Sequence, residues 1–174
     1  TIQEGKLWML QTRSGKRTPP AAVRCAVEMV KEGLIDETTA VKRVKPSDIN
    51  VLMHPTFDPA AKKAVIATGL PASPGAAAGH VYFTAHDAEA HQATGEKVLL
   101  VRHETSPEDV DGMHSAVGIL TSTGGMTSHA AVVARGWGRC CVAGAGEIQI
   151  DEKARKIKVG GKTFGYNDTL SIDG

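Results

Sequence analysis

The sequence has few aromatic residues and few cysteines, and both shortages limit what the chain can be. Its 174 residues include only two Trp, two Tyr and three Phe, so Ala, Val and Gly must supply most of the core, as in tightly wound α/β folds. The three cysteines, Cys25, Cys140 and Cys141, form an odd set with a vicinal pair, which fits neither a disulfide framework nor a zinc site. We therefore expect a reducing compartment inside a cell, either the cytoplasm or an organelle.

Long apolar runs and an excess of one charge sign are also missing. No apolar stretch approaches the length that crosses a bilayer, and the N-terminus lacks the layout of a signal peptide. Twenty Lys and Arg nearly balance 19 Asp and Glu, and no basic run is interleaved with aromatic residues. We expect neither a membrane nor a nucleic acid as a partner.

The first 59 residues have the pattern of a strand followed by helices. Alternation over residues 6–13 predicts a strand with Gln11 and Arg13 on one face, followed by a turn at Ser14–Gly15. Thr18 is expected to cap the first of three helices, which we place at residues 19–32, 36–43 and from about 47 to before Pro55. The segment 54–59 contains two prolines and is expected to be a domain boundary.

From residue 60 the pattern changes to short strands that alternate with helices. We expect strands at residues 64–67, 78–84, 98–101, 116–120 and 140–143, and a turn-rich loop at 69–75. One helix is expected over 107–113, capped by Ser106, and another begins near residue 128. This β-α-β-α-β order predicts a parallel sheet with right-handed crossovers, whereas the residues from 147 onward are typical of antiparallel β structure.

The corner between the strand at 116–120 and the next helix carries the features of an anion site. Ligands of open parallel sheets gather at the carboxyl ends of the strands, and the N-terminus of a helix offers free N–H groups and a positive dipole end to a phosphate. Gly124 and Gly125 would let the backbone approach that phosphate, and Thr127 or Ser128 is the expected helix cap. His129 falls in the first turn, where its ring can carry the phosphoryl group.

Other interpretations of these residues stay open at this stage. His129 can be an ordinary residue beside a helix cap, with Gly124–Gly125 as a plain turn. A metal site is not expected, because His86 and His91 are five residues apart and would point to different sides of a helix.

Three segments resemble the pyruvate, phosphate dikinase family. Residues 124–136 resemble its phosphohistidine signature, residues 69–77 resemble the start of the same domain, and residues 10–13 resemble the end of its nucleotide-binding domain. The resemblance implies a swivelling β/β/α phosphohistidine domain over residues 60–174, with a parallel and an antiparallel sheet beside a helical layer. It also implies a helical linker over 18–59 and the end of an ATP-grasp-like nucleotide-binding domain over 1–17.

The activity that the resemblance implies is the synthesis of phosphoenolpyruvate (PEP). His129 would take a phosphoryl group from ATP and phosphate, with release of AMP and pyrophosphate, and would pass it to pyruvate. The partners would be the nucleotide-binding and PEP/pyruvate-binding domains of the same longer chain, with Mg²⁺ bound mainly alongside ATP and PEP in those domains and the whole protein a homodimer. This chain alone is expected to turn over neither ATP nor pyruvate.

The resemblance also assigns individual positions. Gln11 and Arg13 match nucleotide-contacting positions, although a solvated strand end is the alternative for both. Thr127 matches the threonine whose phosphorylation silences plant members, and a phosphate there would repel the incoming donor. Thr123 stands where the family often has a basic residue, which puts one additional phosphate contact in doubt.

Related families provide the competing interpretations. Pyruvate, water dikinase and the PEP-dependent sugar phosphotransferase share the histidine domain, but they more often carry Arg at the position of Met126. A non-catalytic swivel or docking module with a vestigial histidine is the alternative from a different functional class, and a metal-binding module is a third.

Overall fold

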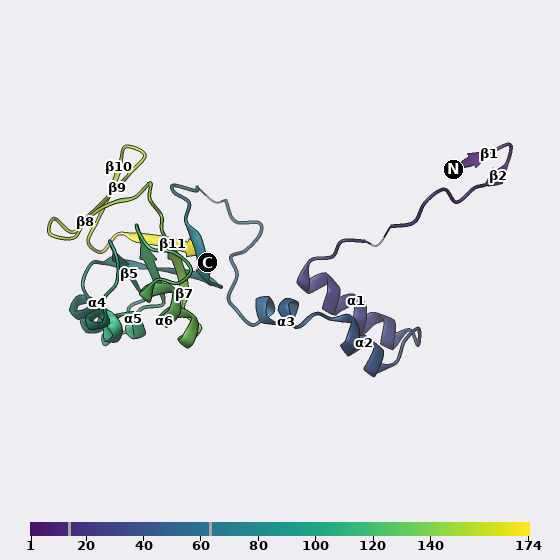
Figure 1. Cartoon of the computed structure of the whole chain (residues 1–174), viewed down its shortest axis with the longest axis horizontal. Coiled ribbons are helices and arrows are strands. Elements are labelled where there is room, and N and C mark those ends of the chain that lie inside the picture. The colour runs from purple at the N-terminus through teal and green to yellow at the C-terminus, as the bar shows by residue number, and fades with distance from the viewer. Residues whose placement is uncertain (14, 63) are drawn as a thin grey trace. The chain divides into compact units, whose positions relative to one another are not determined.

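The computed structural model describes residues 1–13, 15–62 and 64–174 (Figure 1), which form two compact units, Thr1–Met53 and His54–Gly174. The first unit opens with a small antiparallel pair of strands, β1 (Ile2–Gln3) and β2 (Lys6–Leu7). The strand expected over 6–13 is therefore wrong beyond Leu7, because no strand within the described residues pairs with 8–13. Ser14 of the expected turn lies outside the described residues.

Three helices complete the first unit, and the sequence predicts all of them within a residue or two. They are α1 (Pro19–Lys31), α2 (Glu37–Arg43) and α3 (Pro46–Leu52). Thr18 is the N-cap residue of α1, although its side chain makes no capping hydrogen bond. Asp36 does cap α2, since its Oδ1 accepts from the Thr39 N–H at 2.7 Å.

A six-stranded mixed sheet forms the centre of the second unit. Its strands lie in the spatial order β11 (Thr169–Asp173), β4 (Ala76–Tyr82), β5 (Val98–Arg102), β6 (Gly118–Thr121), β7 (Cys140–Ala143) and β3 (Leu70–Ser73). The four inner strands, β4 to β7, are parallel; the β-α-β-α-β order predicts this for β5, β6 and β7. The two edge strands run antiparallel to their neighbours.

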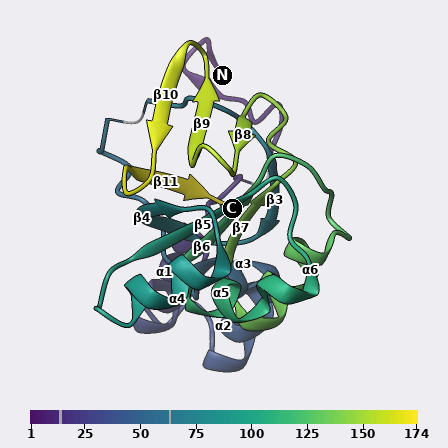
Figure 2. The ribbon, with the colours of Figure 1, turned by 90° about the vertical axis from the view of Figure 1, so that its left-hand side faces the viewer.

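Helices cover one face of this sheet and a second, smaller sheet covers the other (Figure 2). The helical layer contains α4 (Ala85–Gln92), the 3₁₀ turn η1 (Pro107–Asp109), α5 (Val110–Ser115) and α6 (His129–Trp137). The smaller sheet is antiparallel and contains β8 (Gln149–Asp151), β9 (Lys156–Val159) and β10 (Lys162–Gly165). The expected β/β/α domain is confirmed, with the difference that its larger sheet is mixed, because both edge strands are antiparallel.

The core lies on both faces of the main sheet. On the helical face, small side chains of the helices pack against strand residues; these helix residues are Ala88, Ala130, Ala131 and Ala134. On the opposite face, Leu99, Val101 and Leu120 pack with Ile157 and Val159 of the smaller sheet. Because alanines supply so much of the helical layer, α6 can lie close to the strands without large side chains between them.

Two sequence predictions in the second unit are wrong. Residues 64–67 form no strand, and Ile66 and Ala67 instead pack onto the core of the second unit. The expected loop over 69–75 contains strand β3, which tolerates Pro71 because it lies at the sheet edge, with a register irregularity between Pro71 and Ser73. Helix α4 was not predicted from the pattern, because alanines are its only apolar residues.

The described residues contain no helix that is both long enough and apolar enough to cross a membrane.

The vicinal cysteines are buried in β7 and are expected to resist alkylation. Burial raises the pKa of Cys140 to about 11 and that of Cys141 to about 12, so almost no reactive thiolate forms at pH 8. Cys25, partly exposed on α1, should therefore be the only thiol that iodoacetamide modifies in the folded chain, as measured by mass spectrometry of its peptides. All three thiols should react in denaturant, and rapid modification of Cys141 in the native chain would contradict the packing of β7.

Candidate functional site

The loops that follow β5, β6 and β7 meet at the carboxyl ends of these strands. The register of β5 against β6 pairs Arg102 with Thr121, so the loops after these residues leave the sheet side by side. The His103 carbonyl oxygen accepts hydrogen bonds from the N–H and Oγ1 of Thr123, at 3.1 and 2.8 Å. The loop after β7 joins them, because the Gly144 N–H donates to the Thr123 carbonyl at 3.2 Å.

Helix α6 starts at this meeting point with His129 as its first residue. Ser128 is the N-cap, and its Oγ accepts from the Ala131 N–H at 3.4 Å. The N–H groups of His129 and Ala130 have no hydrogen-bond acceptor among the described residues. Ala130 and Ala131 are buried against the sheet, which fixes the start of the helix. The N–H groups of His129 and Ala130 stay available to an anion.

The imidazole ring of His129 is half-buried and is held from one side by Thr105. Thr105 follows β5, and its Oγ1 lies 3.1 Å from Nδ1 of His129. Because Thr105 itself is only 9% exposed, its hydroxyl group has little freedom to turn away. One ring nitrogen is thus engaged by the protein, and Nε2 remains for chemistry.

The two glycines before the helix have different roles. Gly124 has φ +94°, and a side chain there would meet Ser128 Cβ at 2.9 Å, so the tight turn requires glycine. At Gly125 an added Cβ would meet nothing within 4 Å, so the backbone there borders open space. Gly125 therefore leaves open space beside the backbone, whereas Gly124 shapes the loop; the role of both glycines toward a phosphate stays a prediction.

Arg135 of α6 holds the same loop through hydrogen bonds. Its guanidinium donates to the Met126 carbonyl at 2.6 Å and to the Ala72 carbonyl of β3 at 3.1 Å. The loop before His129 is thereby tied both to its own helix and to an edge strand.

The structure brings together most of the predicted site residues. Gly124, Gly125, Thr127 and Ser128 all precede His129 at the start of α6, and the cap is Ser128, while Thr127 is exposed. Gln11 and Arg13 belong to the first unit, where Arg13 Nη2 donates to Gln11 Oε1 at 3.3 Å. Their nucleotide-contacting role stays a prediction.

Thr105 and Arg135 are the site residues that the sequence analysis missed. A signal for Thr105 was present, since the carboxyl ends of adjacent parallel strands meet and the strand at 98–101 was predicted. Arg135 lies in the family-like segment 124–136, but only the folded loop shows that it binds two carbonyl groups.

The described residues contain no group of three His, Cys, Asp or Glu side chains that could hold a metal ion. His91 contacts two tyrosines. Its Nε2 lies 2.7 Å from the Tyr166 hydroxyl, and its ring stacks on Tyr82 with a centroid distance of 4.4 Å.

Comparison with known proteins identifies relatives of this chain. Residues 94–174 match the family model described as "PEP-utilising enzyme, mobile domain". The whole chain is 61% identical to pyruvate, phosphate dikinase of Clostridium symbiosum, 58% to a chloroplastic pyruvate, phosphate dikinase of Mesembryanthemum crystallinum and 57% to pyruvate, phosphate dikinase 2 of Zea mays. It covers 20%, 18% and 20% of these proteins, so the chain spans about a fifth of the length of the curated relatives it matches.

Substitution of Gly144 tests whether the three loops are packed as one site. Gly144 has φ +65°, and an added Cβ would lie 2.6 Å from the Gly124 carbonyl oxygen. We expect Gly144→Ala to destabilise the fold by about 1–3 kcal/mol and to shift the amide resonances of residues 124–129. Gly146→Ala, at a position with open space around the added methyl group, is the control. Unchanged resonances over 124–129 in Gly144→Ala would show that the loops are not coupled.

Proposed function

Since residues 94–174 match the model of the mobile-domain family of PEP-utilising enzymes, we propose that this chain carries a phosphoryl group on Nε2 of His129. The observation that carries the proposal is the contact between Thr105 Oγ1 and His129 Nδ1 at the start of α6. It orients the ring and leaves Nε2 without a hydrogen-bond partner among the described residues.

The contact with Thr105 also favours one tautomer of the ring. A nucleophilic Nε2 needs a lone pair, so the ring proton must be on Nδ1, where it can donate to Thr105 Oγ1. In the transfer step, Nε2 attacks phosphorus, an N–P bond forms, and the P–O bond to the leaving group breaks. The return step reverses this, with the acceptor oxygen attacking phosphorus and the N–P bond electrons returning to Nε2.

The helix start supplies the charge stabilisation for the phosphohistidine. The N–H groups of His129 and Ala130 and the backbone at Gly125 are proposed to bind phosphoryl oxygens, with Thr127 and Ser128 completing the rim of the site. The positive end of the α6 dipole is worth about 0.3–1 kcal/mol toward such an anion at an exposed position.

We propose that the whole protein is a pyruvate, phosphate dikinase. Relatives of that name are 55–61% identical over the entire chain. Its nucleotide-binding and PEP/pyruvate-binding domains would be the partners of this domain and would bind Mg²⁺ together with ATP and PEP, because the described residues offer no metal cluster of their own. The homodimer belongs to this proposal, and so does a reducing compartment, which the three free thiols support.

Further residue roles belong to the same proposal. Gln11 and Arg13 would contact the nucleotide, and their mutual hydrogen bond supports a shared ligand. Thr127 is exposed two residues before His129, where a phosphate on its hydroxyl would add negative charge at the helix end that the donor must approach. The domain division into residues 1–17, 18–59 and 60–174 also remains a proposal.

Pyruvate, water dikinase and the PEP-dependent sugar phosphotransferase are the rival assignments. Met126 at the position where those more often have Arg favours the phosphate-dependent enzyme. An ATP half-reaction that requires inorganic phosphate in the full-length protein distinguishes the three.

The carrier role predicts which residue becomes labelled. Full-length protein incubated with phosphate and ATP labelled in the β-phosphate should acquire acid-labile label on His129, mapped by mass spectrometry at alkaline pH. His129→Asn should acquire none, because an amide has no nucleophilic ring nitrogen. His86→Asn, an exposed histidine of α4, should label like wild type.

Two results would contradict the carrier role. One is label on another residue that persists in His129→Asn, which would favour a vestigial histidine. The other is steady-state AMP release by the purified 174-residue chain, which would show that the chain is more than a carrier.

Removal of the Thr105 hydroxyl should slow phosphorylation of the His129 ring without changing the packing around residue 105. Thr105→Val keeps the side-chain shape but loses the hydrogen bond to Nδ1, so we expect labelling of His129 to slow about five- to tenfold, equivalent to one hydrogen bond of about 1–1.5 kcal/mol. Thr105→Ser retains a hydroxyl and should recover most of the rate. Equal rates for Val and Ser, measured by rapid quench, would remove Thr105 from the mechanism.

A further inference from the structure

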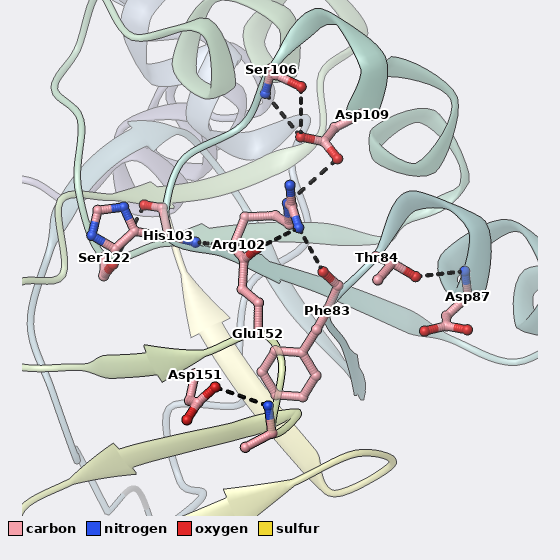
Figure 3. A network of polar contacts seen from close by, with 11 residues as sticks. Phe83, Thr84, Asp87, Arg102, His103, Ser106, Asp109, Ser122, Asp151 and Glu152 are labelled. Atoms are coloured by element: carbon pink, nitrogen blue, oxygen red, sulfur yellow. Dashed lines mark hydrogen bonds and ion pairs between the residues drawn. The ribbon is translucent and has the colours of Figure 1, made fainter.

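The loop that carries Thr105 is itself held by a charged network that includes the smaller sheet (Figure 3). Arg102, the last residue of β5, donates through Nη1 to the Phe83 carbonyl at 3.0 Å and to Glu152 Oε2 at 2.8 Å. Its Nε lies 3.4 Å from Asp109 Oδ1. Arg102 therefore connects two carboxylates that come from opposite sides of the main sheet.

Asp109 fixes the residue that follows Thr105. Its second oxygen, Oδ2, accepts from the Ser106 N–H at 2.9 Å and from Ser106 Oγ at 3.3 Å. Asp109 is only 5% exposed, so these bonds are shielded from competing water. The backbone on the C-terminal side of Thr105 is thereby held in one conformation.

Glu152 fixes the N-terminal side of the same loop. It lies in the turn after β8, and while Oε2 binds Arg102, Oε1 accepts from the His103 N–H at 2.9 Å. The carbonyl of the same residue, His103, is the acceptor for Thr123 in the loop that leads to His129. Glu152 thus contacts the backbone at the point where the two site loops are joined.

An ion pair that served only to attach the hairpin would not need this arrangement. One carboxylate oxygen bound to Arg102 would be enough for attachment, but the second oxygen binds a loop N–H two residues before Thr105. The side chains of Arg102 and Glu152 are also only 21% and 31% exposed, which reduces screening by solvent.

We propose that Glu152, acting with Arg102 and Asp109, is a positioning residue for His129. The turn between β8 and β9 holds the loop over 102–109, that loop places Thr105 Oγ1, and Thr105 sets the tautomer and orientation of the imidazole. The effect on transfer rate rests on the proposed carrier function, whereas the effect on the ring does not.

The ring is tested directly by ¹⁵N NMR of the His129 side chain in the 174-residue chain. Wild type should show one dominant tautomer with the proton on Nδ1, and Glu152→Ala should show a mixture of both tautomers. Glu152→Gln should lie closer to wild type than Glu152→Ala does, because its amide oxygen can still accept from the His103 N–H, although its NH2 group cannot accept from Arg102 Nη1. Glu89→Ala removes an exposed carboxylate of α4 and should leave the ring spectrum unchanged.

The transfer rate provides the second measurement. In the full-length protein, labelling of His129 should slow about tenfold or more in Glu152→Ala with the KM for ATP unchanged, since a displaced nucleophile lowers the rate but not nucleotide binding. Glu152→Gln should recover most of that loss.

The outcomes separate this proposal from the carrier function. A wild-type tautomer ratio in Glu152→Ala would overturn the positioning role, as would a Glu152→Gln ring spectrum that matches Glu152→Ala. If Glu152→Ala does not fold, Glu152→Leu takes its place, because it fills similar space and also removes the acceptor for the His103 N–H; a wild-type tautomer ratio there would equally overturn the proposal. A wild-type protein that never labels on His129, but whose tautomer ratio shifts in Glu152→Ala, would end the carrier proposal and support the positioning role.

Discussion

The parallel pairing of β5 with β6 is the constraint on which the site depends. Its register places Arg102 beside Thr121, so the loops that begin after these residues share hydrogen bonds from their first positions. One loop then carries Thr105 and the other leads to His129, and the two side chains meet 3.1 Å apart. A shift of one residue in this register would turn the inward side chains outward and separate these groups.

Each layer of the second unit contributes a different part of the site at the carboxyl ends of the parallel strands. The helical layer supplies the start of α6, whose alanines fix its position against the strands. The main sheet supplies the loops, and the smaller sheet supplies Glu152. The smaller sheet therefore does more than cover the apolar face of the main sheet, because its first turn reaches the loop that holds the histidine.

The site combines an engaged ring nitrogen with an open helix start. His129 is half-buried, its Nδ1 is engaged by Thr105, and two N–H groups at its helix start have no acceptor among the described residues. The proposed carrier role would use both features, and the chain spans about a fifth of the length of its curated relatives.

The sequence by itself determined the local features of this protein. Apolar patterning and caps located α1, α2, α3, β5 and β7, and the residues from Gly124 to His129 predicted the loop and helix start where the site is proposed, because each of these signals depends on residues close together in the chain. It could not show that residues 70–73 form an edge strand or that 64–67 form none, since strand formation depends on a distant partner. Tertiary structure alone decided that Thr105 contacts His129, Arg135 contacts Ala72 and Glu152 contacts Arg102, which are 24, 63 and 50 residues apart, because no local pattern encodes which loops a sheet register brings together.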